Sequence, residues 1–132
     1  MFHKQLIGLL ISTLCMLINA PVFAKNNPNK DGHALVQDIQ HAGTQIKIEE
    51  DQDEVYDAVR QGYIRPFSEL YAAVEKDLHG RIIKVELDED DDIWIYELKL
   101  NYNNSIIKVE YNAQTLEMIL IEGHNFKQAL RN

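Results

Sequence analysis

The stretch RIIKVELDEDDDIWIYELKL, residues 81–100, decides the fold of this chain. Apolar residues alternate with polar ones in both halves, at Ile83, Val85, Leu87, Trp94, Tyr96, Leu98 and Leu100. A period of two is typical of a β-strand with one buried face. The five acids between the halves, Asp88 to Asp92, suit a turn because acidic side chains hydrogen-bond locally there. The stretch therefore predicts a β-hairpin.

Two further alternating stretches follow, SIIKVEYN (residues 105–112) and LEMILIEG (residues 116–123). The polar connections between successive stretches are short, and short connections join antiparallel neighbours. The sequence therefore predicts an antiparallel β-meander of three to four strands.

Two short helices are expected before the meander. DEVYDAVR (residues 53–60) has acids in its first turn and a cation in its last, and Gly62 and Pro66 end it. SELYAAVEKDLHG (residues 68–80) has Ser68 as a candidate N-cap and Gly80 as its stop. Its apolar stripe is marginal alone and must pack on something. The predicted fold class is α+β, with two short helices packed on one face of the meander.

The other face of the meander is expected to be charged. Its members would be Lys84, Glu86, Glu97, Lys99, Lys108 and Glu110. We expect opposite charges to pair across neighbouring strands, at a few tenths of a kcal/mol for each pair.

The first 24 residues have the pattern of a secretory signal peptide. Lys4 precedes an apolar run from Leu6 to Ile18, and VFA ends at Ala24. The run is shorter than the roughly 20 residues that span a bilayer, so cleavage is favoured over retention as an anchor. The predicted location is periplasmic or secreted, with no membrane span after cleavage.

The rest of the chain divides into three predicted parts. Residues 25–53 are polar and interrupted by Pro and Gly, which indicates a flexible segment with a short helix near Ala34 to His41. Residues 54–122 hold the folded domain. Residues 123–132 form a tail in which Phe126 and Leu130 are spaced for a short amphipathic helix.

The charge balance narrows the classes of partner. The formal net charge is −8, and loss of residues 1–24 removes Lys4 but no acid, which gives −9. Nucleic-acid binding depends on Lys and Arg neutralising phosphates, so no nucleic-acid partner is predicted. A cationic protein partner fits the acidic surface, but a solvated acidic face is the favoured interpretation.

The acidic run raises the question of calcium. Asp88, Asp90 and Asp92 imitate the first three ligands of a calcium loop, but no Gly follows and Lys99 occupies the twelfth position. A hairpin turn is the favoured interpretation, with a weak metal site at these three residues as the alternative. No cofactor is predicted.

No catalytic motif stands out in the sequence. The chain has no Gly-rich phosphate loop, H-E-x-x-H, G-x-S-x-G or C-x-x-C. The prediction is that the protein is not an enzyme.

Four segments in order carry a family resemblance. RQGYIRPFSEL (residues 60–70), GRIIKVEL (80–87), WIYELKL (94–100) and KVEYNAQTLEMI (108–119) together resemble the PepSY domain. The resemblance covers residues 55–122. One departure is the last hairpin, where Leu116 stands in place of the usual Gly, so we expect a rearranged turn with Asn112 taking part of the strain.

The resemblance implies a non-catalytic binding module outside the cytoplasm. It implies a protein partner, with regulation or inhibition of an extracytoplasmic peptidase as the expected role. The alternative is an interaction module for an envelope sensor or stress-response protein, without inhibitory activity. The oligomeric state is left open.

Aromatic residues are the candidate contacts for such a partner, because aromatic side chains dominate interface energetics. Tyr63 and Phe67 flank the Pro66 turn, and Trp94 and Tyr96 lie on a strand. Since Trp94 and Tyr96 alternate in phase with Leu98, the hydrophobic core is the favoured place for that pair.

Overall fold

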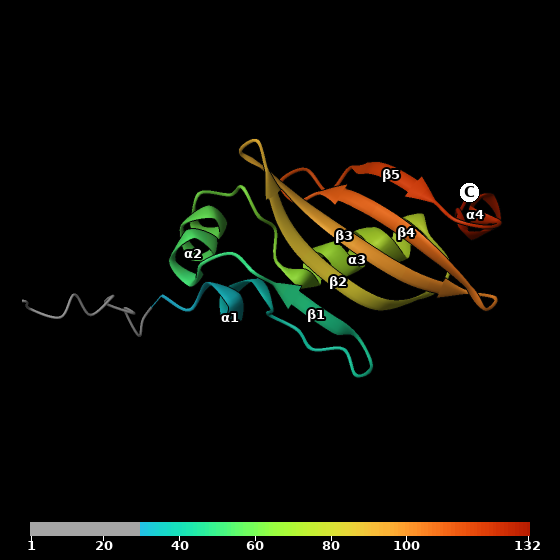
Figure 1. The fold of residues 1–132 in the computed structure, drawn as a ribbon, viewed down its shortest axis with the longest axis horizontal. Coiled ribbons are helices and arrows are strands. Elements are labelled where there is room, and N and C mark those ends of the chain that lie inside the picture. The colour runs from blue at the N-terminus through green and yellow to red at the C-terminus, as the bar shows by residue number, and fades with distance from the viewer. Residues whose placement is uncertain (1–29) are drawn as a thin grey trace, which may run out of the picture.

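The computed structural model describes residues 30–132 as one sheet with helices on one face and at both ends (Figure 1). The elements in chain order are α1 (Gly32–Val36), β1 (Gln45–Ile48), α2 (Gln52–Arg60), α3 (Phe67–Asp77), β2 (Arg81–Asp90), β3 (Ile93–Tyr102), β4 (Ser105–Asn112), β5 (Met118–Glu122) and α4 (Phe126–Ala129). The signal peptide predicted at residues 1–24 lies outside the described residues.

The sheet has five strands in the order β1-β2-β3-β4-β5. Strands β2 to β5 are antiparallel neighbours, as the alternation predicts. Strand β1 joins the outer edge of β2 in parallel, with Gln45 opposite Lys84 and Ile48 opposite Leu87. The predicted α+β class is confirmed, but the prediction lacked this parallel strand. The short helix expected near Ala34 to His41 lies slightly earlier, as α1, and α4 lies in the tail where a short amphipathic helix was expected.

The hydrophobic core lies between the sheet and α3. Tyr96, Leu98 and Leu100 from β3 are fully buried, and Leu70 and Val74 of α3 are buried too. Their polar neighbours along the strands point to the other face, where the described residues place no helix (Figure 1). Removing apolar side chains from water in this layer supplies the main stabilisation of the fold.

Strand β2 departs from strict alternation at its start. The register between β2 and β3 shifts between Ile82 and Lys84, which leaves Ile83 as an extra residue. Ile82, and not Ile83, therefore packs against the core, which corrects the predicted inward set.

The second predicted helix starts two residues earlier than the candidate N-cap Ser68 implies. Its N-cap is Pro66, which offers no side-chain cap, and Ser68 lies in the first turn. The backbone N–H of Ser68 donates to Asp38 Oδ1 at 2.9 Å, and its hydroxyl donates to Asp38 Oδ2. Ser68 is thus not the N-cap; the first turn of α3 is capped by a carboxylate from a distant part of the chain.

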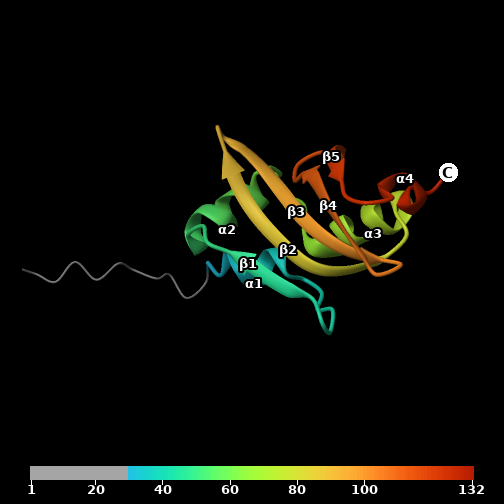
Figure 2. The same cartoon turned by 45° about the vertical axis from the view of Figure 1, so that its right-hand side comes forward.

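Residues 30–50, which we call the strap, are structured although residues 25–53 read as flexible. The strap contains α1 and β1, and contacts between α1 and α2 gather these helices at one end of the sheet (Figure 2). Gly32 makes this contact close: a Cβ there would lie 2.2 Å from Gln52 O and 2.4 Å from Tyr56 N. The strap is ordered by contacts to distant residues, so its local polar composition wrongly predicts a flexible segment.

Three connections of the meander use the left-handed region of backbone space. The two-residue turns Asp91–Asp92 and Asn103–Asn104 have positive φ at all four residues, as in the primed turns that match strand twist. Leu116 also has a positive φ, 58°. The expected rearrangement was therefore wrong in its main point, since Leu116 keeps the conformation that Gly would adopt. Asn112 supports it by accepting the N–H groups of Gln114 and Thr115 through its side chain.

Candidate functional site

The face of the sheet opposite α3, which we call the open face, is ordered into charged rows. Register places Lys84, Lys99 and Lys108 opposite one another across β2, β3 and β4. The next row towards the β2–β3 turn is acidic, with Glu86, Glu97 and Glu110 opposite one another. Directly opposed charges within these two rows are therefore alike, which is unfavourable by itself. The expected opposite pairs form at the flanks, where Lys47 of β1 lies opposite Glu86 and Glu122 of β5 lies opposite Lys108.

Ion pairs between the rows offset this repulsion. Lys108 Nζ lies 3.8 Å from Glu97 Oε2 and 3.7 Å from Glu110 Oε1. Glu86 contacts two lysines, Lys84 at 3.5 Å and Lys47 of β1 at 3.3 Å. The Lys47–Glu86 pair is directly cross-strand, the Lys108–Glu97 pair is diagonal, and the other two run along a strand. Part-exposed pairs of this kind contribute little stability each. The rows thus form a fixed pattern of alternating charge rather than a strong staple.

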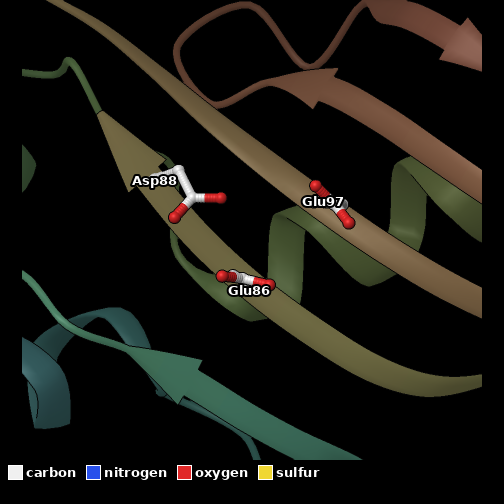
Figure 3. A group of neighbouring side chains, drawn as sticks. All are labelled: Glu86, Asp88 and Glu97. Carbon is white, nitrogen blue, oxygen red and sulfur yellow. The ribbon is translucent and has the colours of Figure 1, made fainter. Parts of the chain in front are cut away.

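Three carboxylates converge near the middle of the open face. Oxygens of Glu86 and Asp88 on β2 and Glu97 on β3 lie within 4.8 Å of one another (Figure 3). Desolvation, with the nearby charge of Glu86 as the next cause, raises the pKa of Asp88. Asp88 is the residue shared with the predicted metal set, whereas Asp90 and Asp92 lie exposed at the hairpin tip. The cluster could offer three oxygens to a cation, but lysines already contact Glu86 and Glu97.

The four aromatic residues predicted as partner contacts separate into two groups. Trp94, Tyr96 and Phe67 are buried in the core, at 8%, 0% and 1% exposure. The Tyr96 hydroxyl donates to Arg65 O at 2.6 Å, and the rings of Phe67 and Tyr96 meet edge to face. Burial raises the pKa of Tyr96 well above its usual value. Tyr63 alone of the four is exposed, at 46%.

Residues 66–122 match the family model described as peptidase propeptide and YPEB domain, PepSY. The chain contains a PepSY domain. No curated protein and no solved structure matches the chain.

The PepSY domain runs from Pro66 to Glu122, so it begins at the N-cap of α3 and ends with β5. It holds the helix, the four antiparallel strands and nearly the whole open face. PepSY domains are in general non-catalytic modules linked to peptidase propeptides. The strap and α2 precede the matched residues and add β1, which brings Lys47 to the open face.

Sequence reasoning missed a groove between the strap and α3 of the PepSY domain. This cavity of about 600 Å³ is lined by His41 and Thr44 from the strap, Tyr71 and Leu78, and Arg81. Because the strap read as flexible, no signal in the sequence placed these residues together.

Within residues 30–132, no helix is both long and apolar enough to cross a membrane.

Proposed function

We propose that this chain is a non-catalytic PepSY binding module that acts in the periplasm or after secretion and regulates or inhibits an extracytoplasmic peptidase. The proposal rests on one observation above others: the PepSY sheet presents a face without a helix, carrying a row of lysines beside a row of glutamates. The family description, peptidase propeptide, supplies the class of partner.

The open face has the properties of a recognition surface. Its charges are part-buried and paired, with side-chain exposures of 16% for Glu86 and 25% for Glu97, so their positions are fixed before a partner arrives. Fixed charges set specificity and steer association more than they add affinity. A partner would need cationic groups opposite the Glu86 and Glu97 row.

Tyr63, in the connection between α2 and α3, is the aromatic candidate for contact with the partner. It follows Gly62, which has a φ of 83°, and its N–H donates to Ala58 O at 2.8 Å, so the backbone of the turn is held while the ring stays exposed. Exposed tyrosines on rigid turns make good interface contacts because they order few rotatable bonds.

The test is an inhibition assay with the purified chain. We would titrate it against a panel of extracytoplasmic peptidases, thermolysin-type metalloproteases included, with a fluorogenic peptide as substrate. The proposal expects saturable loss of activity with at least one peptidase. It also expects weaker inhibition by the double variant Glu86→Gln with Glu97→Gln.

A matched control removes two exposed carboxylates away from the open face, Glu54→Gln with Glu117→Gln. This variant should inhibit like the parent chain. Unchanged peptidase rates across the panel, together with capture of the outer domain of an envelope sensor, would replace the proposal by the non-inhibitory alternative.

A further inference from the structure

The strap groove lies on the covered side of the PepSY domain and takes no part in the open face. One wall comes from the strap at Ile39, His41 and Thr44, and the other from the α3 side chains of Tyr71 and Val74. The Thr44 hydroxyl donates to Ile82 O at 2.9 Å, which fixes the strap against β2. The groove is therefore a built feature, held by the strap's attachment to both α3 and the sheet.

Two arginine side chains line the groove. Arg131 is fixed there, because its Nε donates to Leu78 O at 3.0 Å and its N–H donates to Asp77 O at 2.8 Å. Arg81 reaches towards the strap, with its Nη1 3.3 Å from where a Cβ on Gly43 would lie.

These two cations have no anionic partner in the part of the chain that the structure describes. None of the salt bridges there involves Arg81 or Arg131. Glu75 lines the same groove and is its one carboxylate among the described lining residues. In a chain of net charge −8, two guanidinium groups against one carboxylate make this groove a local site for an anion. Guanidinium is also the group best shaped to bind a carboxylate through paired hydrogen bonds.

A second, independent observation concerns Tyr71, which lines the same groove. Tyr71 is only 7% exposed, and its hydroxyl is buried without a hydrogen-bond partner. The His41 ring lies 4.4 Å from the Tyr71 ring and covers it from the strap side. Burial raises the pKa of Tyr71 against a smaller lowering by the nearby Thr44 side chain, so the hydroxyl stays protonated and can donate. A buried donor without an acceptor is costly, and an acceptor supplied by a ligand would remove that cost.

We propose that the strap groove binds a short apolar peptide by its free α-carboxylate. The carboxylate would lie against Arg81 and Arg131, and a peptide carbonyl would accept a hydrogen bond from the Tyr71 hydroxyl. Apolar side chains of the peptide would face Ile39, Val74 and Leu78. Polar groups recur along the whole groove, which suits a peptide backbone better than the plain hydrocarbon chain of a fatty acid. The cavity volume lies within the range typical of ligand sites.

The experiment is calorimetric titration of the full chain with acetyl-Ala-Val-Ala-Leu as the free acid and as the C-terminal amide. The free acid should bind, and the amide should bind roughly tenfold more weakly or worse because it loses the charge-assisted hydrogen bonds. Arg81→Gln should weaken binding of the acid to a similar extent, and Tyr71→Phe should weaken it without loss of folding. The matched control is Arg60→Gln, which removes an exposed guanidinium outside the groove.

Three outcomes would overturn the proposal. These are equal binding of acid and amide, no heat at millimolar peptide, and tighter binding of decanoate than of the peptide. The proposal does not rest on peptidase regulation, because the Glu86→Gln with Glu97→Gln variant should keep full affinity for the peptide. Failure of the groove and failure of the open face are thus observed separately.

Discussion

The strap and the β2–β5 meander contribute strands to the same sheet, yet they are held by different kinds of contact. Each strand of the meander pairs with its neighbour in sequence, and two of its turns have only two residues. The strap is held by contacts to distant residues: Asp38 to Ser68, Thr44 to Ile82, and Glu50 Oε1 to the N–H of Glu89.

The difference shows where stability is local and where it is tertiary. The meander carries its own pattern, and its core residues are fully buried. The strap has short elements that would not form alone, since a helix of five residues is far below the length that is stable in water. Changes in the meander should therefore act on the whole fold, whereas changes in the strap should act on the strap first.

The largest effect is expected in the meander. Leu98 is fully buried in the central strand, so Leu98→Ala should lower the free energy of unfolding by about 2–5 kcal/mol. Urea unfolding followed by tryptophan fluorescence measures it, since Trp94 lies on the same strand. A loss below roughly 1 kcal/mol would mean that the meander is not the common core.

Gly32→Ala is the corresponding change in the strap. Its Cβ would meet backbone atoms of α2 at 2.2 Å and 2.4 Å, which must move apart, at a cost of about 1–3 kcal/mol. Amide hydrogen exchange should lose protection in α1 and β1 while β3 and β4 keep theirs. Equal loss in all strands would contradict the separation between strap and meander. Gly62→Ala is a useful control, because nothing lies within 4 Å of a Cβ there, although its φ of 83° adds some strain.

Asp38→Ala tests the clamp between the strap and α3. It removes the acceptor of both the N–H and the hydroxyl of Ser68, and we expect a loss of about 1 kcal/mol. The matched control is Asp31→Ala, which removes the cap of α1 within the strap. If Asp38→Ala lowers the melting temperature no more than a substitution of exposed Gln40, the clamp contributes nothing.

A smaller change of opposite sign is expected in the acidic turn. Replacing Asp91–Asp92 by Asn–Gly keeps the positive φ values, removes two like charges and suits the primed turn better, so stability should rise by about 0.5 kcal/mol. The same exchange at the second turn, Asn104→Gly, should gain less because no charge is removed. Thermal melting of the two variants compares them. A destabilised acidic-turn variant would show that Asp91 or Asp92 makes a favourable contact.

The smallest effect is a pH dependence at Asp88. The folded-state pKa of Asp88 is raised above the ordinary value of 3.8, so the folded state binds the proton more tightly than the unfolded state does. The stabilisation by the bound proton is lost as the pH rises through the raised pKa. Asp88→Asn should therefore raise the unfolding midpoint at neutral pH, and the gain should vanish below pH 3.8. Denaturant melts at a series of pH values measure this. A gain that stays constant with pH would exclude charge as its cause.

The sequence predicted the meander because its alternating residues carry the information locally. β3 is the plainest example, with Trp94, Tyr96, Leu98 and Leu100 all buried as their spacing requires. The bulge at Ile83 escaped because only the pairing with β3 defines it. The charged open face was predicted in membership, and opposite charges do pair across some neighbouring strands. The opposition of Glu86 to Glu97 was missed, since that register is a property of the folded sheet.

The strap and its groove could not be predicted in the same way. β1 has four residues, Gln45–Ile48, which is too short for a periodic signal, and the groove unites strap, α3 and C-terminal residues. Nothing in the sequence of the tail marks Arg131 as a groove residue; its hydrogen bond to Leu78 O in the folded chain brings it there.

The parallel pairing of β1 with β2 has a consequence for the order of folding. The β2–β3 and β3–β4 hairpins close through two-residue turns, so they can form in microseconds without help from the rest of the chain. Gln45 can meet Lys84 only when α2 and α3 have both folded back between them, and closing so long a loop delays the contact. β1 is thus the last strand to join and the first to leave. Each time β1 separates from β2, the edge of β2 becomes exposed and the strap groove opens. A molecule that bridges the strap and α3 therefore also slows the first step of unfolding.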